Sequence, residues 1–180
     1  SGAPLLPAVH AGTRNSCGLA WLSVTGAELR LAECPADALE AWIARVGPSE
    51  LLYSAEVTPG FEQRLKAARN GAAFTLSVRP AWQFDGGLGE RKLCEQMGSN
   101  SLAAWNAEAL ANAHAAAAAL LGYAEHTQGR TLSHVQRLSV ERDGELIELP
   151  PTTRRNLELV QTLRGEDSPT LFSLLDTCMT

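Results

Sequence analysis

The sequence has few aromatic residues and no excess of positive charge. Aromatic residues make up 6% of its 180 positions, and the formal net charge is −5. Domains whose main task is to grip phosphates are usually basic, so this balance argues against such a role. The chain also has no apolar run long enough to span a membrane, and no signal-peptide pattern. A hydrophobic content of 45% and a charged content of 19% are typical of a soluble globular protein of one or two domains.

Metal-ligand patterns are missing as well. None of the four cysteines stands at C-x-x-C spacing to another, and the four histidines supply no complementary pair. The residues concerned are Cys17, Cys34, Cys94, Cys178, His10, His114, His126 and His134. Their spacing predicts no zinc site. Separately, we expect no cofactor to be bound by this chain itself. The cysteine spacing fits reduced, partly buried thiols in a cytoplasmic protein.

In the first half of the chain, stretches with the apolar spacing of strands alternate with stretches that have the apolar spacing of helices. Period-two and short apolar runs predict strands at residues 5–11, 18–24, 28–34, 50–54 and 74–78, the last as a buried parallel strand. Helical spacing predicts helices after Pro35 and after Thr58, which is a favourable N-cap followed by Pro59. The order is therefore β-β-β-α-β-α-β, a meander followed by crossovers. It predicts an α/β fold of ribonuclease H-like type, with helices flanking a mixed sheet.

Two further helices are predicted before residue 128. The first covers residues 85–97 and starts in a glycine-rich stretch; the second runs from residue 102, capped by Ser101, to about residue 126. Five consecutive alanines at 115–119 allow a neighbouring backbone to approach closely, so we expect this helix to be sandwiched. Its larger contacts are expected to be Leu110, Leu120, Leu121 and Tyr123. The pattern then breaks, which predicts a first domain of residues 1–128 and a second of residues 129–180.

The second part is predicted to be short and mainly helical. A hairpin is expected over residues 138–149, and Pro150-Pro151 then suit the first turn of a helix. Arg154 and Arg155 fall in that first turn, where the helix dipole disfavours cations, so we expect them to serve another purpose. A last helix starts at Ser168. Because no capping signal closes it, we expect the polypeptide to be cut within a larger domain.

Five stretches of the sequence resemble, in the same order, successive segments of one protein family. They are Leu19-Ala20-Trp21-Leu22-Ser23, Glu50-Leu51-Leu52-Tyr53, Trp82-Gln83-Phe84-Asp85, Thr153-Arg154-Arg155-Asn156-Leu157-Glu158-Leu159 and Thr170-Leu171-Phe172-Ser173-Leu174-Leu175-Asp176. Through them the chain resembles the DNA mismatch-repair family MutS over nearly its whole length. The resemblance implies a ribonuclease H-like connector domain in residues 1–128 and the start of the core, or lever, domain in residues 129–180.

The resemblance also implies a function. The parent protein is expected to bind mismatched or looped DNA, to bind and hydrolyse ATP with magnesium, and to recruit MutL. This chain lacks the Phe-x-Glu mismatch reader and a Walker A loop, so it is expected to be non-catalytic. Its expected role is to couple the mismatch-binding part to the core and ATPase parts, and to offer a docking surface for MutL. DNA is expected to be a partner only through the parent protein, and no membrane is expected.

Four basic residues are candidates for contacts with other molecules or domains. Arg91 and Lys92 fall at positions that match the MutL-docking surface of the family, and both are expected to be exposed on the helix over residues 85–97. A plain solvated face is the alternative for this pair. For Arg154 and Arg155 we expect an internal ion pair or a contact to an adjoining domain, with DNA phosphate as the alternative, because the surrounding stretch is not basic.

Two alternative functions are weighed against this interpretation. An independent ribonuclease H-like enzyme needs acidic residues on and near its first strand to hold two metal ions. Residues 5–11 contain no acid, and Glu28 and Glu33 on the third strand have no acidic partner on the first strand.

A direct nucleic-acid binding module is the other alternative. The run of residues 85–92 matches no phosphate-loop pattern, and the four tryptophans at positions 21, 42, 82 and 105 are expected in the core rather than on a base-stacking platform.

Overall fold

A computed structural model describes residues 5–23, 28–128 and 135–142. The chain divides into two compact units, residues 1–141 and 142–180, and the account below concerns the first. Its strands are β1 (Ala8–Ala11), β2 (Ser16–Leu22), β3 (Glu28–Pro35), β4 (Glu50–Ser54), β5 (Thr75–Arg79) and β6 (Arg137–Val140). Its α-helices are α1 (Leu39–Val46), α2 (Pro59–Gly71), α3 (Gly86–Met97) and α4 (Ala111–Gln128), with 3-10 turns η1 (Ala36–Ala38), η2 (Ala81–Gln83) and η3 (Ala103–Trp105).

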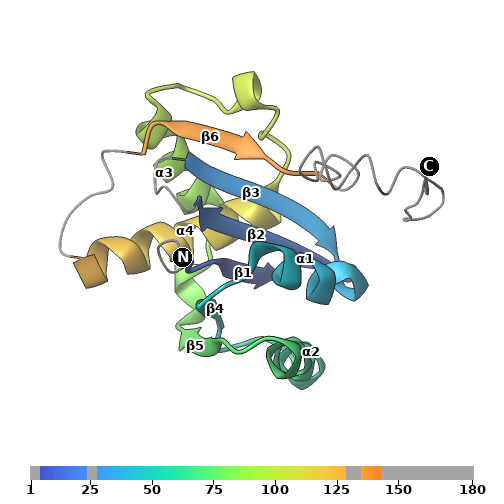
Figure 1. The fold of residues 1–180 in the computed structure, drawn as a ribbon. Helices are drawn as coiled ribbons and strands as arrows, with labels where there is room; N and C mark the ends of the chain where they lie inside the picture. The colour runs from blue at the N-terminus through green and yellow to red at the C-terminus, as the bar shows by residue number, and fades with distance from the viewer. Residues whose placement is uncertain (1–4, 24–27, 129–134, 143–180) are drawn as a thin grey trace, which may run out of the picture. The chain divides into compact units, whose positions relative to one another are not determined.

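The strands form one sheet in the order β5-β4-β1-β2-β3-β6 (Figure 1). The pairs β1–β2 and β2–β3 are antiparallel, whereas β1–β4, β4–β5 and β3–β6 are parallel. The first five strands thus make a three-stranded meander extended by two crossover strands, which is the ribonuclease H-like arrangement. This confirms the predicted fold class. Figure 1 shows α1 and α2 on one side of the sheet and α4 on the other, with α3 against α4.

Several predicted helix ends are confirmed by their local geometry. The Thr58 hydroxyl accepts a hydrogen bond from the backbone N–H of Phe61 at 3.2 Å, and Pro59 opens α2. Helices α1 and α3 both end at glycines in the left-handed conformation, Gly47 at φ 68° and Gly98 at φ 66°. Each of these caps involves only residues within one turn of the helix end, and so the sequence alone could locate them.

Helix α4 starts later than expected. The predicted start at residue 102 is wrong, because the chain first forms η3 and then turns at Asn106, which has a left-handed φ of 55°. The Ser101 hydroxyl accepts a 3.3 Å hydrogen bond from the N–H of Ala103, but the residue that caps η3 is Leu102, and the long helix begins only at Ala111. Leu102 and Leu110 are both buried, so burial of this connection explains why the turn interrupts the helical pattern.

Two expectations near β5 are also wrong. The strand over residues 74–78 was expected to be parallel and buried; β5 does pair with β4 in parallel, but it is an edge strand and Val78 is 51% exposed. Trp82 was expected in the core and is 73% exposed, whereas Trp21 and Trp42 are buried as expected. An apolar run does not reveal whether a strand has neighbours on one side or two, and this explains both errors.

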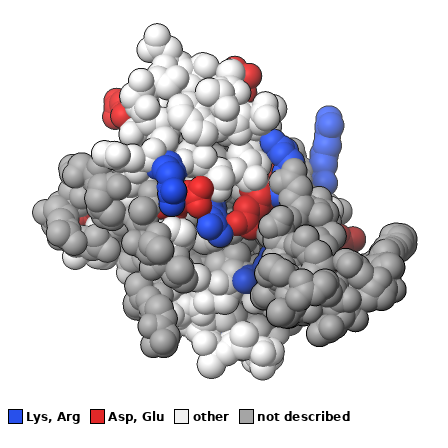
Figure 2. Space-filling view, turned by 45° about the horizontal axis from the view of Figure 1, so that its top comes forward, with Lys and Arg blue, Asp and Glu red and all other residues white. Residues whose placement is uncertain are grey.

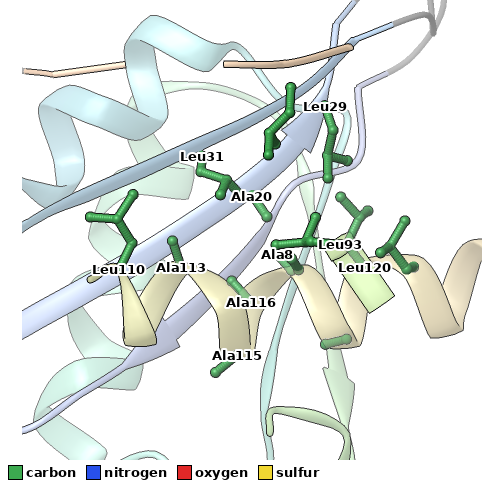
Figure 3. Packing of buried hydrophobic residues seen from close by; sticks show 14 of the residues in the cluster. Ala8, Ala20, Leu29, Leu31, Leu93, Leu110, Ala113, Ala115, Ala116 and Leu120 are labelled. Atoms are coloured by element: carbon green, nitrogen blue, oxygen red, sulfur yellow. The ribbon is translucent and has the colours of Figure 1, made fainter. Parts of the chain in front are cut away.

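The alanine run of α4 is buried on all sides. Every residue from 115 to 119 is at most 2% exposed, and α4 packs against the sheet on one side and α3 on the other (Figure 3). Glycines permit the close approach: a Cβ on Gly18 of β2 would lie 2.1 Å from the Asn112 carbonyl carbon, and a Cβ on Gly89 of α3 would lie 1.7 Å from the His114 oxygen. The expected sandwiching of α4 is therefore confirmed. It depends on a glycine in each of the two neighbouring elements, β2 and α3, where their backbones approach α4.

The start of α4 is capped by a side chain from the sheet. The Glu33 carboxylate on β3 accepts hydrogen bonds from the backbone N–H groups of Asn112 at 2.8 Å and Ala113 at 3.1 Å. These are first-turn donors that have no partner within the helix, and a negative charge is favoured there. The Asn112 side chain also donates to the Ser16 hydroxyl at 2.9 Å. The meander and α4 are thus joined through polar groups as well as apolar packing.

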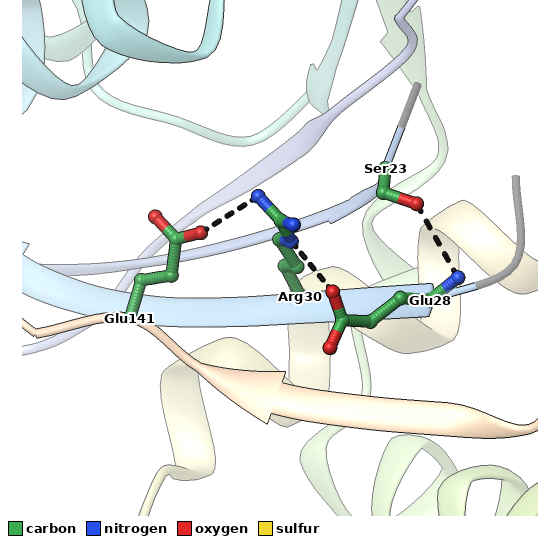
Figure 4. Close-up of polar contacts among 4 residues, drawn as sticks. All are labelled: Ser23, Glu28, Arg30 and Glu141. Atoms are coloured by element: carbon green, nitrogen blue, oxygen red, sulfur yellow. Dashed lines mark hydrogen bonds and ion pairs between the residues drawn. The ribbon is translucent and has the colours of Figure 1, made fainter. Parts of the chain in front are cut away.

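The sheet continues past the boundary expected after residue 128. Strand β6 pairs with β3, and the N–H of Glu141 donates to the Leu31 carbonyl at 2.8 Å. Arg30 joins the two strands further, with 3.0 Å ion pairs to both Glu28 and Glu141 (Figure 4). The predicted hairpin over residues 138–149 extends beyond the described residues, as do the predicted helices that follow it. Among the described helices, none is long and apolar enough to cross a membrane.

We expect Gly89→Ala to destabilise the fold. The new methyl group would meet backbone rather than a flexible side chain, so α3 must shift, at a cost of about 1–3 kcal/mol. Gly87→Ala is the matched control on the same helix, because its nearest neighbour would lie at an ordinary 3.5 Å. Urea unfolding followed by circular dichroism measures both, and equal stability of the two variants would contradict the packing described here.

Removing the Glu33 carboxylate should weaken the attachment of α4. Glu33→Ala leaves two first-turn N–H groups without their acceptor, and we expect a loss of about 1–2 kcal/mol in the free energy of unfolding. Glu108→Ala is the control, because Glu108 is exposed in the segment just before α4 and should change stability by less than about 0.5 kcal/mol. Hydrogen exchange at Ala113 should rise only in the Glu33 variant, and protection there equal to the unmodified chain would argue against the cap.

Candidate functional site

A cleft of about 570 Å³ opens at the carboxyl ends of β1 and β4. Its walls come from the end of β1, the β1–β2 turn, the start of α2 and η2, and they include His10, Cys17, Ser54, Thr58, Arg64 and Phe84. Ligands of open α/β sheets commonly bind at the carboxyl ends of parallel strands. The strand order therefore makes this cleft the candidate ligand-binding site of the sheet.

His10 is the titratable side chain that β1 contributes to this cleft. Its ring stacks on Phe84 with a centroid distance of 6.1 Å, and its buried Nδ1 has no hydrogen-bond partner among the described residues. Burial lowers the pKa of His10 below its ordinary value, so the ring is neutral at pH 7. A neutral, stacked imidazole does not replace the carboxylate that a two-metal nuclease needs on this strand.

The acidic residues of the third strand are committed elsewhere. Glu33 caps α4, and Glu28 pairs with Arg30. The two glutamates are five positions apart on β3, so they point to opposite faces of the sheet and cannot share one metal ion. Among the described residues, no group of three or more His, Cys, Asp or Glu side chains is placed to hold a metal ion. Neither of these two glutamates lines the cleft.

The glycine-rich start of α3 also has a structural explanation. The Asp85 carboxylate accepts a hydrogen bond from the N–H of Leu88 at 3.0 Å and so occupies the helix N-terminus. A phosphate at this point would compete with that negative charge. Gly89 is required by the contact with α4 described above. These two residues account for the pattern that resembled a phosphate loop.

Helix α3 presents Arg91 to solvent, as predicted, but Lys92 differs from the expectation. Lys92 is half-buried, and its Nζ lies 3.6 Å from a carboxylate oxygen of Glu125 on α4. Glu90 and Glu95 are exposed on α3 next to Arg91, so the helix face carries charges of both signs. The prediction that both basic residues are exposed is thus wrong for Lys92, because α4 runs alongside α3 at that position.

Exposed Trp82 is the residue that sequence reasoning missed. It follows β5 in η2, close to exposed Val78, and the neighbouring Arg79 guanidinium lies 5.1 Å from the centre of the Tyr123 ring. Arg79 also donates from Nε to the Gln83 side chain at 3.1 Å, which holds η2 against the end of β5. The signal in the sequence is Pro80, which cannot continue the strand and so places Trp82 in the turn that follows β5.

Charge on the described surface is mixed. Figure 2 shows basic and acidic side chains interleaved in a band across the middle of one face, with mostly uncharged residues above and below it and acidic side chains at the upper edges. The described residues on this face form no basic stripe of the kind that follows a phosphate backbone. The other predicted contact residues, Arg154 and Arg155, lie outside the described residues.

Comparison with known proteins gives a family and a structural likeness. The family described as MutS domain II matches residues 4–136, which include β1 through the end of α4. Among solved structures, the chain is similar to T. thermophilus RuvC in complex with a Holliday junction substrate, at 13% identity and a TM-score of 0.47, covering 69% of this chain and 96% of that one. A likeness of that extent carries no conclusion about what this chain binds. The family match spans well over half of the sequence, and the chain belongs to the MutS domain II family, the connector domain of DNA mismatch-repair proteins.

Proposed function

We propose that this chain is a non-catalytic connector that couples the mismatch-binding part of a cytoplasmic MutS protein to its core and ATPase parts, and that it offers a docking surface for MutL. The observation that supports it most is the family match over residues 4–136. Residues 129–180 are proposed to lead into the core domain of that parent, and mismatched DNA and ATP with magnesium are proposed to be bound by other parts of it.

The docking surface is proposed to be the solvent-facing side of α3, centred on Arg91. Two contacts favour this helix as a rigid platform. Gly89 lets its backbone lie directly on α4, and the pair of Lys92 with Glu125 joins the two helices at their surface. Because α4 is fixed to the sheet through Glu33, a partner on α3 is connected to the body of the domain. A fixed surface loses little conformational entropy on binding, and this favours affinity.

The same layering supports the coupling role. Coupling between distant sites needs packed elements that transmit a displacement, and α4 packs against α3 and strands β1, β2 and β3. Arg30 and its two glutamates tie the last described strand to the meander. A shift imposed at either end of this unit would therefore move the sheet and its helices together.

Reversing both basic residues of α3 should weaken binding to the N-terminal part of MutL. For Arg91→Glu with Lys92→Glu we expect at least a tenfold rise in Kd, about 1.4 kcal/mol, measured by titration calorimetry. The matched control is Lys66→Glu with Arg69→Glu on α2, which makes the same change of net charge at one half-buried and one exposed position. We expect that control to bind as the unmodified chain does.

A third variant separates docking from the loss of the ion pair between the helices. Lys92→Glu combined with Glu125→Lys restores a pair of opposite charges and leaves Arg91 in place. If α3 docks MutL mainly through Arg91, this swap should bind nearly as well as the unmodified chain. Equal binding by the double reversal, with its fold intact by circular dichroism, would remove Arg91 and Lys92 from the surface while leaving the family assignment untouched.

The alternative functions predict activity on DNA by the chain alone. We expect no cleavage of homoduplex or mismatched DNA with Mg²⁺ or Mn²⁺, because β1 carries His10 and no carboxylate. In gel shifts of the same mixtures we expect only weak retardation that disappears with added salt. Metal-dependent cleavage that is lost in a variant of a cleft residue would establish the enzyme instead.

A further inference from the structure

Two of the cysteines face each other across neighbouring strands. Cys17 on β2 is directly opposite Cys34 on β3, and both side chains lie on the same face of the sheet. Opposite residues of an antiparallel pair have Cα atoms about 4.5–5.5 Å apart. A disulfide spans about 4.4–6.8 Å between Cα atoms, so the backbone needs little movement to allow one. Their sequence spacing gave no sign of this pairing.

The two thiols are chemically unequal. A hydrogen bond from Cys34 lowers the pKa of Cys17, burial opposes that shift, and the positive charge of Arg64 assists it, with a lowered pKa as the net result. The thiolate is the nucleophilic form of cysteine, so Cys17 is the member that attacks first. Cys17 also forms part of the wall of the cleft at the end of β1, although only 1% of its surface is exposed, and Cys34 is 6% exposed.

Cys94 differs from the Cys17–Cys34 pair in its pKa and in its position. It is half-buried on α3, and its pKa is raised by burial and by the negative charge of Glu90. It has neither a lowered pKa nor an opposing strand. Exposure by itself would favour oxidation of Cys94, whereas thiolate character and a neighbouring thiol favour the pair at the cleft.

We propose that Cys17 and Cys34 form a reversible dithiol–disulfide pair that a small peroxide oxidises through the cleft. The Cys17 thiolate attacks one peroxide oxygen, the O–O bond breaks, and Cys17 sulfenic acid and a hydroxide are formed. The hydroxide takes a proton and leaves as water. The Cys34 sulfur then attacks the Cys17 sulfur, its proton goes to the departing oxygen, and a second water leaves. Two thiols are oxidised by two electrons in all, and one peroxide is reduced to two waters.

The experiment uses the folded 180-residue chain with hydrogen peroxide as the oxidant. After quenching with N-ethylmaleimide and digestion with trypsin, we expect a linked peptide joining residues 15–30 to residues 31–45, since cleavage after Arg30 separates the two cysteines. Two of the four thiols should lose reactivity with maleimide, and dithiothreitol should restore them. Closing the loop between β2 and β3 should also raise the Tm of the oxidised chain.

Four controls make the result decisive. Cys34→Ser should trap Cys17 as a sulfenic acid that dimedone labels, whereas Cys17→Ser should remove both the label and the linked peptide. Cys94→Ser combined with Cys178→Ser should keep the linked peptide in full. The same oxidation in guanidinium should give mixed pairings, because the sheet no longer holds the thiols together. Linked peptides that contain Cys94 or Cys178 in the folded chain, or oxidation of Cys17 without a link to Cys34, would overturn the proposal.

Discussion

The close approach of α4 to the elements on both its sides is the constraint on which the rest of the structure depends. A helix whose centre is alanine fills space only if neighbouring backbones come near it, and Gly18 and Gly89 let β2 and α3 do so. Glu33 then satisfies the first-turn N–H groups of α4 from within the sheet. Helix α3 packs mainly on α4, and its Gln96 side chain also donates to the Val135 carbonyl before β6 at 2.7 Å, so these contacts position its exposed face. The proposed docking surface and the order of the sheet are thus linked through one helix.

The position of the cleft and the chemistry it could support depend on different features of the chain. Its place at the carboxyl ends of β1 and β4 is set by strand order alone, but catalysis by two metal ions requires carboxylates that converge there. In this chain the strand contributes a neutral histidine stacked on Phe84, while Glu33 and Glu28 serve a helix cap and an ion pair. The contacts of the β3 carboxylates are thus ones that stabilise the domain. The same cleft leaves Cys17 next to a space that a small molecule can enter, with Cys34 behind it.

The sequence predicted some helix ends and one candidate docking residue correctly, and it missed others. Thr58 with Pro59, and the glycines that end α1 and α3, were found because capping depends on residues within one turn of each other. The start of α4 was missed because Asn106 and the burial of Leu110 act through contacts outside the helix. For the candidate docking pair, Arg91 was placed correctly, whereas the position of Lys92 required knowing that Glu125 lies across from it. Trp82 was assigned to the core because composition does not reveal which strand is at an edge.

By itself, the sequence determined the order of strands and helices, the ribonuclease H-like class that follows from it, and the family, since these are set by local periodicity and by the succession of short motifs. Only the tertiary structure decided which residues meet. It brought Glu33 to the start of α4, placed Cys34 opposite Cys17, and gave Lys92 a partner on another helix. The physical reason is that hydrophobic periodicity identifies the face of each element, whereas partners far apart in the chain are selected by register and packing distance.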